Sequence, residues 1–268
     1  MRDTDGTATL TFWDHLDALR QCLIRIAIVT VACALVAFLF KDEMFRIILA
    51  PKHVDFVTYR WLSSVSNWFM QQGNAPETFS VKLINTGLSA QFLIHMQAAM
   101  YMGLLCASPY ILYLLFRFIS PALYQREKKV AFRMVGGGYV MFILGVALSY
   151  FLIFPLTFRF LGTYQVSAEV ENTITLQSYM DTQMMMNLMM GIVFEIPVLC
   201  WLLARFGLIS ATFMRRYRRH AIIIILIIAA VITPTSDVFT LSLVAMPMWL
   251  LYEVSILIVK RTHNINKE

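Results

Sequence analysis

The chain has 268 residues, of which 59% are hydrophobic and 14% are charged. This apolar content is well above that of a soluble domain, so the composition indicates a polytopic membrane protein. At about 20 apolar residues for each spanning helix, the length allows about six passes and excludes a separate soluble enzyme domain. The net charge of +6 then reflects membrane topology rather than a nucleic-acid partner.

Six apolar segments follow one another, and we expect an all-α membrane protein with six transmembrane helices, the last two short. The segments are residues 22–40, 92–119, 135–154, 184–203, 221–233 and 238–259. The fifth would cover only about 20 Å as a helix, against a hydrocarbon core of about 30 Å. It either thins the bilayer or re-enters it. We expect residues 1–268 to form a single integral membrane domain.

Lys and Arg residues are distributed unevenly between the two sides of the membrane. Only six of the 22 fall in the two predicted loops of residues 41–91 and 155–183. The positive-inside rule therefore places both termini in the cytoplasm, with 41–91 as the first external loop and 155–183 as the second. The basic cluster at residues 215–219 is then explained as a stop signal that contacts lipid headgroups.

Glu195 is the most unusual residue of the fourth segment, because every other residue of 188–203 is apolar, Gly or Pro. An acidic side chain at the centre of a membrane helix costs roughly 2.5 to 3.5 kcal/mol, so it indicates a functional polar site. Pro197 bends the same helix. Alternatives are a structural hydrogen-bonding group, or the protonatable transport residue of a small ion-coupled permease. Gln183 and Asn187, one helical turn apart, suit hydrogen bonds to a partner helix.

Several chemistries lack sequence support. The four cysteines fall in membrane segments and the five histidines are scattered, so neither a disulfide framework nor a metal site is indicated. No nucleophile, base and orienting residue are grouped, and there is no phosphate-binding glycine loop. We therefore expect no enzyme activity, no cofactor and no metal.

Two segments on the predicted cytoplasmic side carry acidic groups. Residues 1–21 are predicted to form an amphipathic N-terminal helix on the membrane face that runs into the first span, with Asp14 and Asp17 at positions i and i+3. The loop of residues 118–129 contains one carboxylate, Glu127. A carboxylate flanked by aromatic residues suits recognition of a guanidinium group, which pairs with it bidentately. The alternative is a solvated surface charge in a weak local ion pair.

Four motifs, in order along nearly the whole chain, resemble those of the TatC family, the multispanning core of the twin-arginine protein translocase. They are the segment 15–20 (His-Leu-Asp-Ala-Leu-Arg), the hairpin 118–124 (Phe-Ile-Ser-Pro-Ala-Leu-Tyr) with Glu127, the segment 194–198 (Phe-Glu-Ile-Pro-Val), and the segment 233–239 (Thr-Pro-Thr-Ser-Asp-Val-Phe) followed by 246–248 and Glu253.

This resemblance implies a receptor for export signal peptides that carry an Arg-Arg pair. It would work in the bacterial inner membrane as part of an oligomeric complex with TatA-like and TatB-like single-span partners, and move folded proteins with the proton motive force. Each site residue has an implied role. Glu127 contacts the arginines with support from Phe118 and Arg20; Glu195 and Pro197 belong to the intramembrane polar site, Asp237 to the turn before the last span, and Pro51 and Pro121 to structural loops.

The chain departs from the family pattern at two places. The position where the family usually has Glu before Leu-Arg is Ala18. We expect Asp17 or Asp14 to supply the second carboxylate of the signal-peptide site. Leu241 replaces the polar residue expected shortly after Asp237, so a partner there would meet apolar surface instead.

Overall fold

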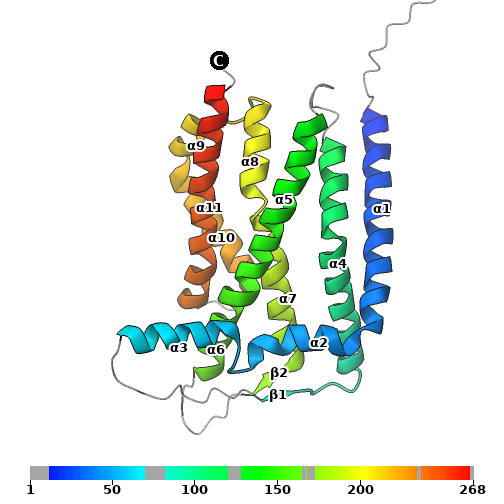
Figure 1. Cartoon of the computed structure of the whole chain (residues 1–268), viewed down its shortest axis with the longest axis vertical. Coiled ribbons are helices and arrows are strands. Elements are labelled where there is room, and N and C mark those ends of the chain that lie inside the picture. The colour runs from blue at the N-terminus through cyan, green and yellow to red at the C-terminus, as the bar shows by residue number, and fades with distance from the viewer. Residues whose placement is uncertain are drawn as a thin grey trace, which may run out of the picture.

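Long helices form most of the computed structural model, which describes residues 12–69, 82–119, 128–164, 167, 173–233 and 237–265. Five stretches are long and apolar enough to cross a membrane, and they are Leu16–Leu39, Ala90–Phe118, Val135–Thr163, Leu176–Arg205 and Val238–Thr262. A shorter apolar helix, α10 (Arg218–Ile232), stands in the same bundle (Figure 1). The prediction of an all-α polytopic membrane protein is confirmed.

The main helices run up and down, so both ends of the described chain lie at the same end of the bundle (Figure 1). We call this the terminal end, and the opposite end the cap end. Besides α10, the upright helices are α1 (Phe12–Leu39), α4 (Ala90–Ile119), α5 (Lys128–Leu148), α7 (Leu176–Val193), α8 (Ile196–Arg205) and α11 (Val238–Ile265). The described part of the predicted N-terminal helix, from Phe12, is continuous with the first span.

α1 packs mainly along α4, and a glycine brings the two backbones together. A Cβ atom on Gly103 would lie 2.5 Å from the backbone nitrogen of Ala34, closer than real atoms approach. Ala98, Ala99 and Ala107 of α4 are also buried. Inside a membrane the hydrophobic effect does not drive helices together. Small residues stabilise the helix pair instead, because they let the backbones approach closely enough for dispersion contacts.

The cap end is built from the predicted first external loop, which contains short helices. Its elements are α2 (Lys41–Leu49), the 3-10 turn η1 (Ala50–Lys52), α3 (Val57–Phe69) and β1 (Leu83–Ile84). β1 pairs in parallel with β2 (Ile174–Thr175), so the two predicted external loops are joined. The membrane side of the cap continues from α5 through a π-helical turn, η3 (Ser149–Ile153), into α6 (Phe154–Thr163).

Three tyrosine hydroxyls bind carbonyl groups at the end of α2 and in η1. The last carbonyls of a helix have no partner within it, so they need donors from elsewhere. The donor and acceptor pairs are Tyr150 with Ile47 (2.6 Å), Tyr179 with Ile48 (3.0 Å) and Tyr59 with Pro51 (3.2 Å). These bonds tie α2 and η1 to α3, η3 and α7.

Tyr59 also donates to the carbonyl of Pro155 at 3.0 Å, so one hydroxyl joins α3, η1 and α6. Burial raises the pKa of Tyr59, while the nearby Arg159 guanidinium opposes this shift. The hydroxyl therefore keeps its proton and remains a hydrogen-bond donor at neutral pH.

The last two helices differ in length. α10 has 15 residues, which is about 22 Å and short of a typical hydrocarbon core. α11 has 28 residues, so the prediction that both are short is right for α10 and wrong for α11. Its final turns are held by packing, because Ile256 and Val259 are buried against Met214 of α9 (Ala211–Arg216).

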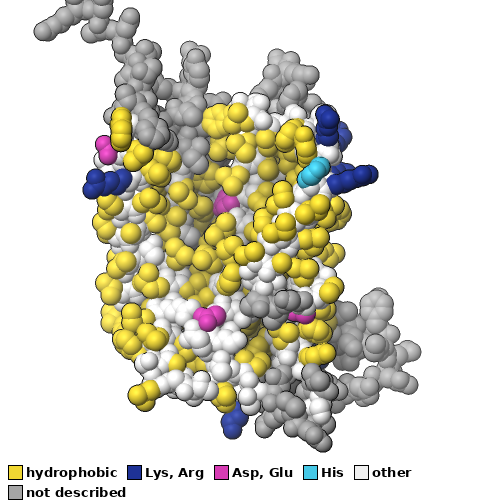
Figure 2. Space-filling view, turned by 180° about the vertical axis from the view of Figure 1, so that it is seen from behind, with side chains coloured by type: hydrophobic (Ala, Val, Ile, Leu, Met, Phe, Trp, Pro, Cys, Tyr) yellow, Lys and Arg dark blue, Asp and Glu magenta, His cyan; other side chains and the backbone are white. Residues whose placement is uncertain are grey.

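The outer surface of the bundle matches a membrane environment. Figure 2 shows apolar side chains over the middle of one face, with the Lys and Arg side chains toward its two ends. On α10, the exposed side chains include Ile223, Ile224 and Ile227. The bundle therefore presents an apolar belt between two charged ends, as a bilayer requires.

Candidate functional site

The fourth apolar segment is divided into α7 and α8, and Glu195 lies at the division. Pro197 is in the first turn of α8 and has no N–H to donate to the carbonyl of Val193, four residues earlier. The Glu195 N–H bonds to the Ile192 carbonyl at 3.1 Å, and the Leu199 N–H bonds to the Glu195 carbonyl at 2.9 Å. The chain therefore continues through the membrane, but the series of helical backbone hydrogen bonds is interrupted at this point.

The carboxyl group of Glu195 is enclosed by the protein. The residue is 8% exposed, and neither carboxyl oxygen has a hydrogen-bond partner among the described residues. An ideal Cβ on Gly138 of α5 would lie 3.0 Å from Glu195 Oε2 and 2.9 Å from the ring of Phe116 in α4. Phe116 belongs to a buried apolar cluster with Leu112, Phe142 and Leu202. Among the described residues, the site thus gives this acid group no hydrogen-bond donor, whereas buried polar groups usually have one.

Gln183 and Asn187 face the interior of the chain. Each is 2% exposed, which contradicts the prediction that they bond to a partner helix. The Asn187 side chain interacts with Tyr101 of α4, while Gln183 Oε1 and Asn187 Oδ1 have no hydrogen-bond partner among the described residues. The polar stripe of α7 therefore points into the bundle.

The residues proposed for signal-peptide recognition belong to the terminal end. Asp17 and Arg20 are exposed near the start of α1, and Phe118 is half-buried in the last turn of α4. Because α1 and α4 are antiparallel neighbours, these residues lie at the same end of one helix pair (Figure 1). Outside the described residues, or with a side chain outside them, are Pro121, Glu127 and Asp14.

Asp237 and Pro51 have structural contacts. Asp237 Oδ2 accepts the Thr240 N–H at 2.6 Å, and the Asp237 carbonyl accepts the Leu241 N–H at 3.1 Å. This is the geometry of a helix N-cap, so Asp237 begins α11. Pro51 is buried in η1 and its carbonyl binds Tyr59. Both residues shape turns at the cap end.

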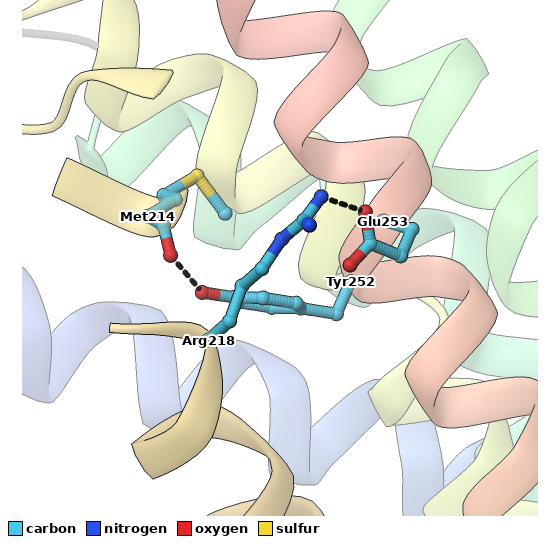
Figure 3. Close-up of polar contacts among 4 residues, drawn as sticks. All are labelled: Met214, Arg218, Tyr252 and Glu253. Atoms are coloured by element: carbon cyan, nitrogen blue, oxygen red, sulfur yellow. Dashed lines mark hydrogen bonds and ion pairs between the residues drawn. The ribbon is translucent and has the colours of Figure 1, made fainter. Parts of the chain in front are cut away.

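In the half of the bundle nearer the terminal end, which we call the terminal half, α11 is bonded to α9 and α10 (Figure 3). Arg218, at the start of α10, pairs with Glu253 of α11 at 2.5 Å. The neighbouring Tyr252 donates to the carbonyl of Met214 at 2.8 Å. In the sequence Glu253 is visible only as part of a motif, and the structure gives it this partner.

In the part of the chain that the structure describes, no three His, Cys, Asp or Glu side chains are grouped so that they could hold a metal ion. The four cysteines are free, and Cys22, the most buried, lies in α1. The group that stands out is the enclosed carboxyl of Glu195.

Comparison with known proteins identifies the family to which this helical membrane protein belongs. The family model described as Sec-independent protein translocase protein (TatC) matches residues 14–247. The chain belongs to the TatC family. It is 32% identical to the Sec-independent protein translocase protein TatC of Blattabacterium sp. subsp. Periplaneta americana over 93% of this chain and 94% of that protein. The TatC of Carboxydothermus hydrogenoformans is 30% identical, over 94% and 93% of the two chains.

A solved structure shares the fold of this TatC-family chain. The crystal structure of a protein named twin arginine translocase receptor TatC superimposes with a TM-score of 0.74 and 29% identity, covering 93% of this chain and 99% of that one. The chain is therefore a multi-pass membrane protein of the Sec-independent translocase. Its family is one of translocase components.

Two contacts of this TatC-family chain were not predicted from the sequence. Gly138 meets Glu195, and Arg218 meets Glu253. Three consecutive glycines at 136–138 were a visible signal for close packing, but the sequence did not show which of them faces the acid group. The Arg218 pair joins residues 35 positions apart, which spacing alone does not reveal.

Proposed function

We propose that the terminal end of this chain binds export signal peptides that carry consecutive arginines, and that this end is cytoplasmic. The observation that carries the proposal is the helix pair α1 and α4, which presents Asp17, Arg20 and Phe118 at one end of the bundle. The hairpin with Glu127 joins α4 to α5 at the same end. The related solved structure is that of a protein named as a twin arginine translocase receptor, which supports the same assignment.

The chemistry of recognition is an arginine–carboxylate pair. Arginine presents a planar fork of N–H donors that two carboxylate oxygens accept together, whereas lysine offers a point charge. Glu127 supplies one carboxylate, and Asp17 or Asp14 supplies the second in place of the residue that Ala18 replaces. Phe118 adds an aromatic surface, and Arg20 helps to hold the acidic groups.

Orientation and assembly follow from the surface. Most of the Lys and Arg residues belong to the terminal side, and by the positive-inside rule this supports a cytoplasmic terminal end. TatA-like and TatB-like single-span partners dock against the apolar belt near α10 and α11. Glu195 provides a polar contact within the membrane only when its carboxyl group leaves its enclosed position. Folded cargo crosses with energy from the proton motive force, in an oligomeric complex.

Photocrosslinking in membranes tests the receptor proposal. A probe at Phe118 or Gln125 is exposed to signal peptides that carry Arg-Arg or Lys-Lys. We expect selective crosslinking to Arg-Arg, and a loss of at least about tenfold with Glu127→Ala, because a charge-assisted pair contributes roughly 1.5–3 kcal/mol. Glu43→Ala in α2, at the cap end, is the matched control and leaves crosslinking unchanged. Equal crosslinking of both peptides in folded protein would refute the proposal.

The second carboxylate has its own test. Asp17→Ala and Asp14→Ala are compared separately and together for crosslinking and export. Loss in one single variant identifies the residue that compensates for Ala18. If the double variant binds and exports as the parent does, this assignment is wrong.

The permease alternative makes a different prediction. A permease loses solute flux with Glu195→Ala while Glu127→Ala is silent. A receptor shows the opposite sensitivity in peptide binding. Measuring both variants in both assays separates the two functions.

A further inference from the structure

Gly138 lies where three elements meet. It is buried in α5, and a Cβ atom there would contact Glu195 Oε2 at 3.0 Å and the ring of Phe116 at 2.9 Å. Contacts this short are not tolerated without movement of a neighbour. Because Gly138 has no Cβ atom, it leaves the space that the Glu195 carboxyl group occupies beside the Phe116 ring.

The two preceding glycines provide a contrast within the same helix. Ideal Cβ atoms on Gly136 and Gly137 would meet no atom within 4 Å, and both residues are exposed. Helix propensity penalises all three glycines similarly, by about 1 kcal/mol relative to alanine. Of these three glycines, Gly138 is therefore the one at which neighbouring side chains leave no room for a Cβ atom.

Further along α5, this helix packs closely against α7. A Cβ on Gly145 of α5 would lie 2.5 Å from the Met190 carbonyl of α7, and one on Gly191 of α7 would lie 2.8 Å from the Phe142 ring of α5. With α5 and α7 held this close, a side chain at position 138 has little room to be absorbed by helix separation. The part that can move is the end of the Glu195 side chain.

We propose that Gly138 is a positioning residue, which with Phe116 forms a cradle that holds the Glu195 carboxyl group inside the bundle. The cradle also connects the Glu195 site with the hairpin of the proposed signal-peptide receptor. This connection rests on the proposed function. Phe116 is in the last turn of α4 and Gly138 is in α5, so the cradle is made by both arms of the hairpin that carries Glu127. Displacement of either arm by a bound signal peptide changes the space around Glu195.

A labelling experiment tests the position of the carboxyl group directly. Dicyclohexylcarbodiimide, an apolar reagent that modifies carboxyl groups from the lipid phase, is applied to the full-length protein in membranes, and labelling of Glu195 is followed by mass spectrometry. We expect Gly138→Ala to raise the labelling rate about fivefold, because overpacking of this contact forces the carboxyl group out of the cradle. Gly136→Ala and Gly137→Ala are the matched controls and leave the rate unchanged.

Two further variants separate positioning from general damage to the fold. Glu195→Asp is shorter by one methylene, so Gly138→Ala is expected to have little added effect on labelling in that background. Phe116→Ala opens the cradle from the side of α4 and raises Glu195 labelling, even if Gly138→Ala does not fold. Equal labelling in parent, Gly138→Ala and Phe116→Ala would overturn the proposal.

Export activity is measured separately from labelling. In export assays, Gly138→Ala is expected to reduce transport about tenfold, and to have no further effect in a Glu195→Ala background, because residues in contact are not additive. Additive losses would overturn the cradle as the cause. If the parent shows no Arg-Arg selectivity, the receptor function fails while the labelling result still decides the position of Glu195.

Discussion

The polar contacts of the cap end and of the terminal half differ in burial and in how far apart in the sequence the joined elements lie. At the cap end, buried tyrosine hydroxyls donate to backbone carbonyls and join α2, η1, α3, α6 and α7 across the molecule. At the terminal half, Figure 3 shows a partly exposed ion pair and one part-buried tyrosine bond, from Tyr252 to the Met214 carbonyl. They join α11 to α9 and α10, which lie just before it in the chain. The difference indicates that the cap contacts fix the helices relative to one another more firmly than the contacts of the terminal half do.

The largest effect is expected from removing Tyr179 at the cap end. Its ring packs edge-on against Phe154 at 5.1 Å and Phe158 at 5.0 Å between centroids, and its hydroxyl binds the Ile48 carbonyl. Tyr179→Ala should lower the free energy of unfolding by about 3–5 kcal/mol, because it leaves a cavity in a packed core. Unfolding in mixed SDS micelles, followed by tryptophan fluorescence, measures the change.

Tyr217→Ala, an exposed tyrosine at the terminal end, is the control for that variant. It should alter the free energy of unfolding by about 0.5 kcal/mol or less. Similar losses for the two variants would remove the distinction between the ends.

A smaller effect is expected when only the hydroxyl of Tyr59 is removed. Tyr59→Phe keeps the ring but leaves the carbonyls of Pro51 and Pro155 without this donor. The expected loss is about 1–3 kcal/mol, the cost of unsatisfied buried groups. The same unfolding assay applies, with Tyr139→Phe at an exposed position as control. A neutral Tyr59→Phe would show that the cap does not depend on this bond.

The smallest effect is expected at the ion pair. Side-chain exposure is 47% for Arg218 and 27% for Glu253, so solvent screens their attraction. Arg218→Ala and Glu253→Gln should show a coupling energy of about 1 kcal/mol or less in a double-mutant cycle, decreasing with added salt. A coupling as large as the Tyr59 effect would mean that the terminal half is tied as firmly as the cap.

The apolar segments were predictable because each spanning helix needs a long hydrophobic run. The proline after Glu195 also predicted an irregularity in the fourth helix. Its start was predicted too late, at Met184, because Gln177, Asp181 and Gln183 indicate a loop. In the structure, Gln97 of α4 and Gln177 both donate to Asp181, at 2.7 and 2.9 Å, so these polar groups satisfy one another within helices.

The cap helices and the cradle could not be predicted from the order of residues alone. α2 and α3 lack a 20-residue apolar run, and their stability depends on contacts with η3, α6 and α7 that are distant in sequence. Gly136, Gly137 and Gly138 are identical as letters, and only packing distinguishes the one that meets Glu195. The proposed signal-peptide site remains a prediction, since it depends on Glu127 outside the described residues.

The packing of α1 against α4 has a consequence for biosynthesis. Only 17% of the apolar window of α1 is buried in the finished protein, and Gly103 allows a close approach at Ala34. At about 5–20 residues per second, the ribosome needs several seconds after α1 to complete the segment that ends at Gly103. We expect α1 to reside in the lipid as a single helix during that interval, because its long apolar surface is compatible with lipid on all sides. Docking of α4 is then a late assembly step between two helices that are already inserted.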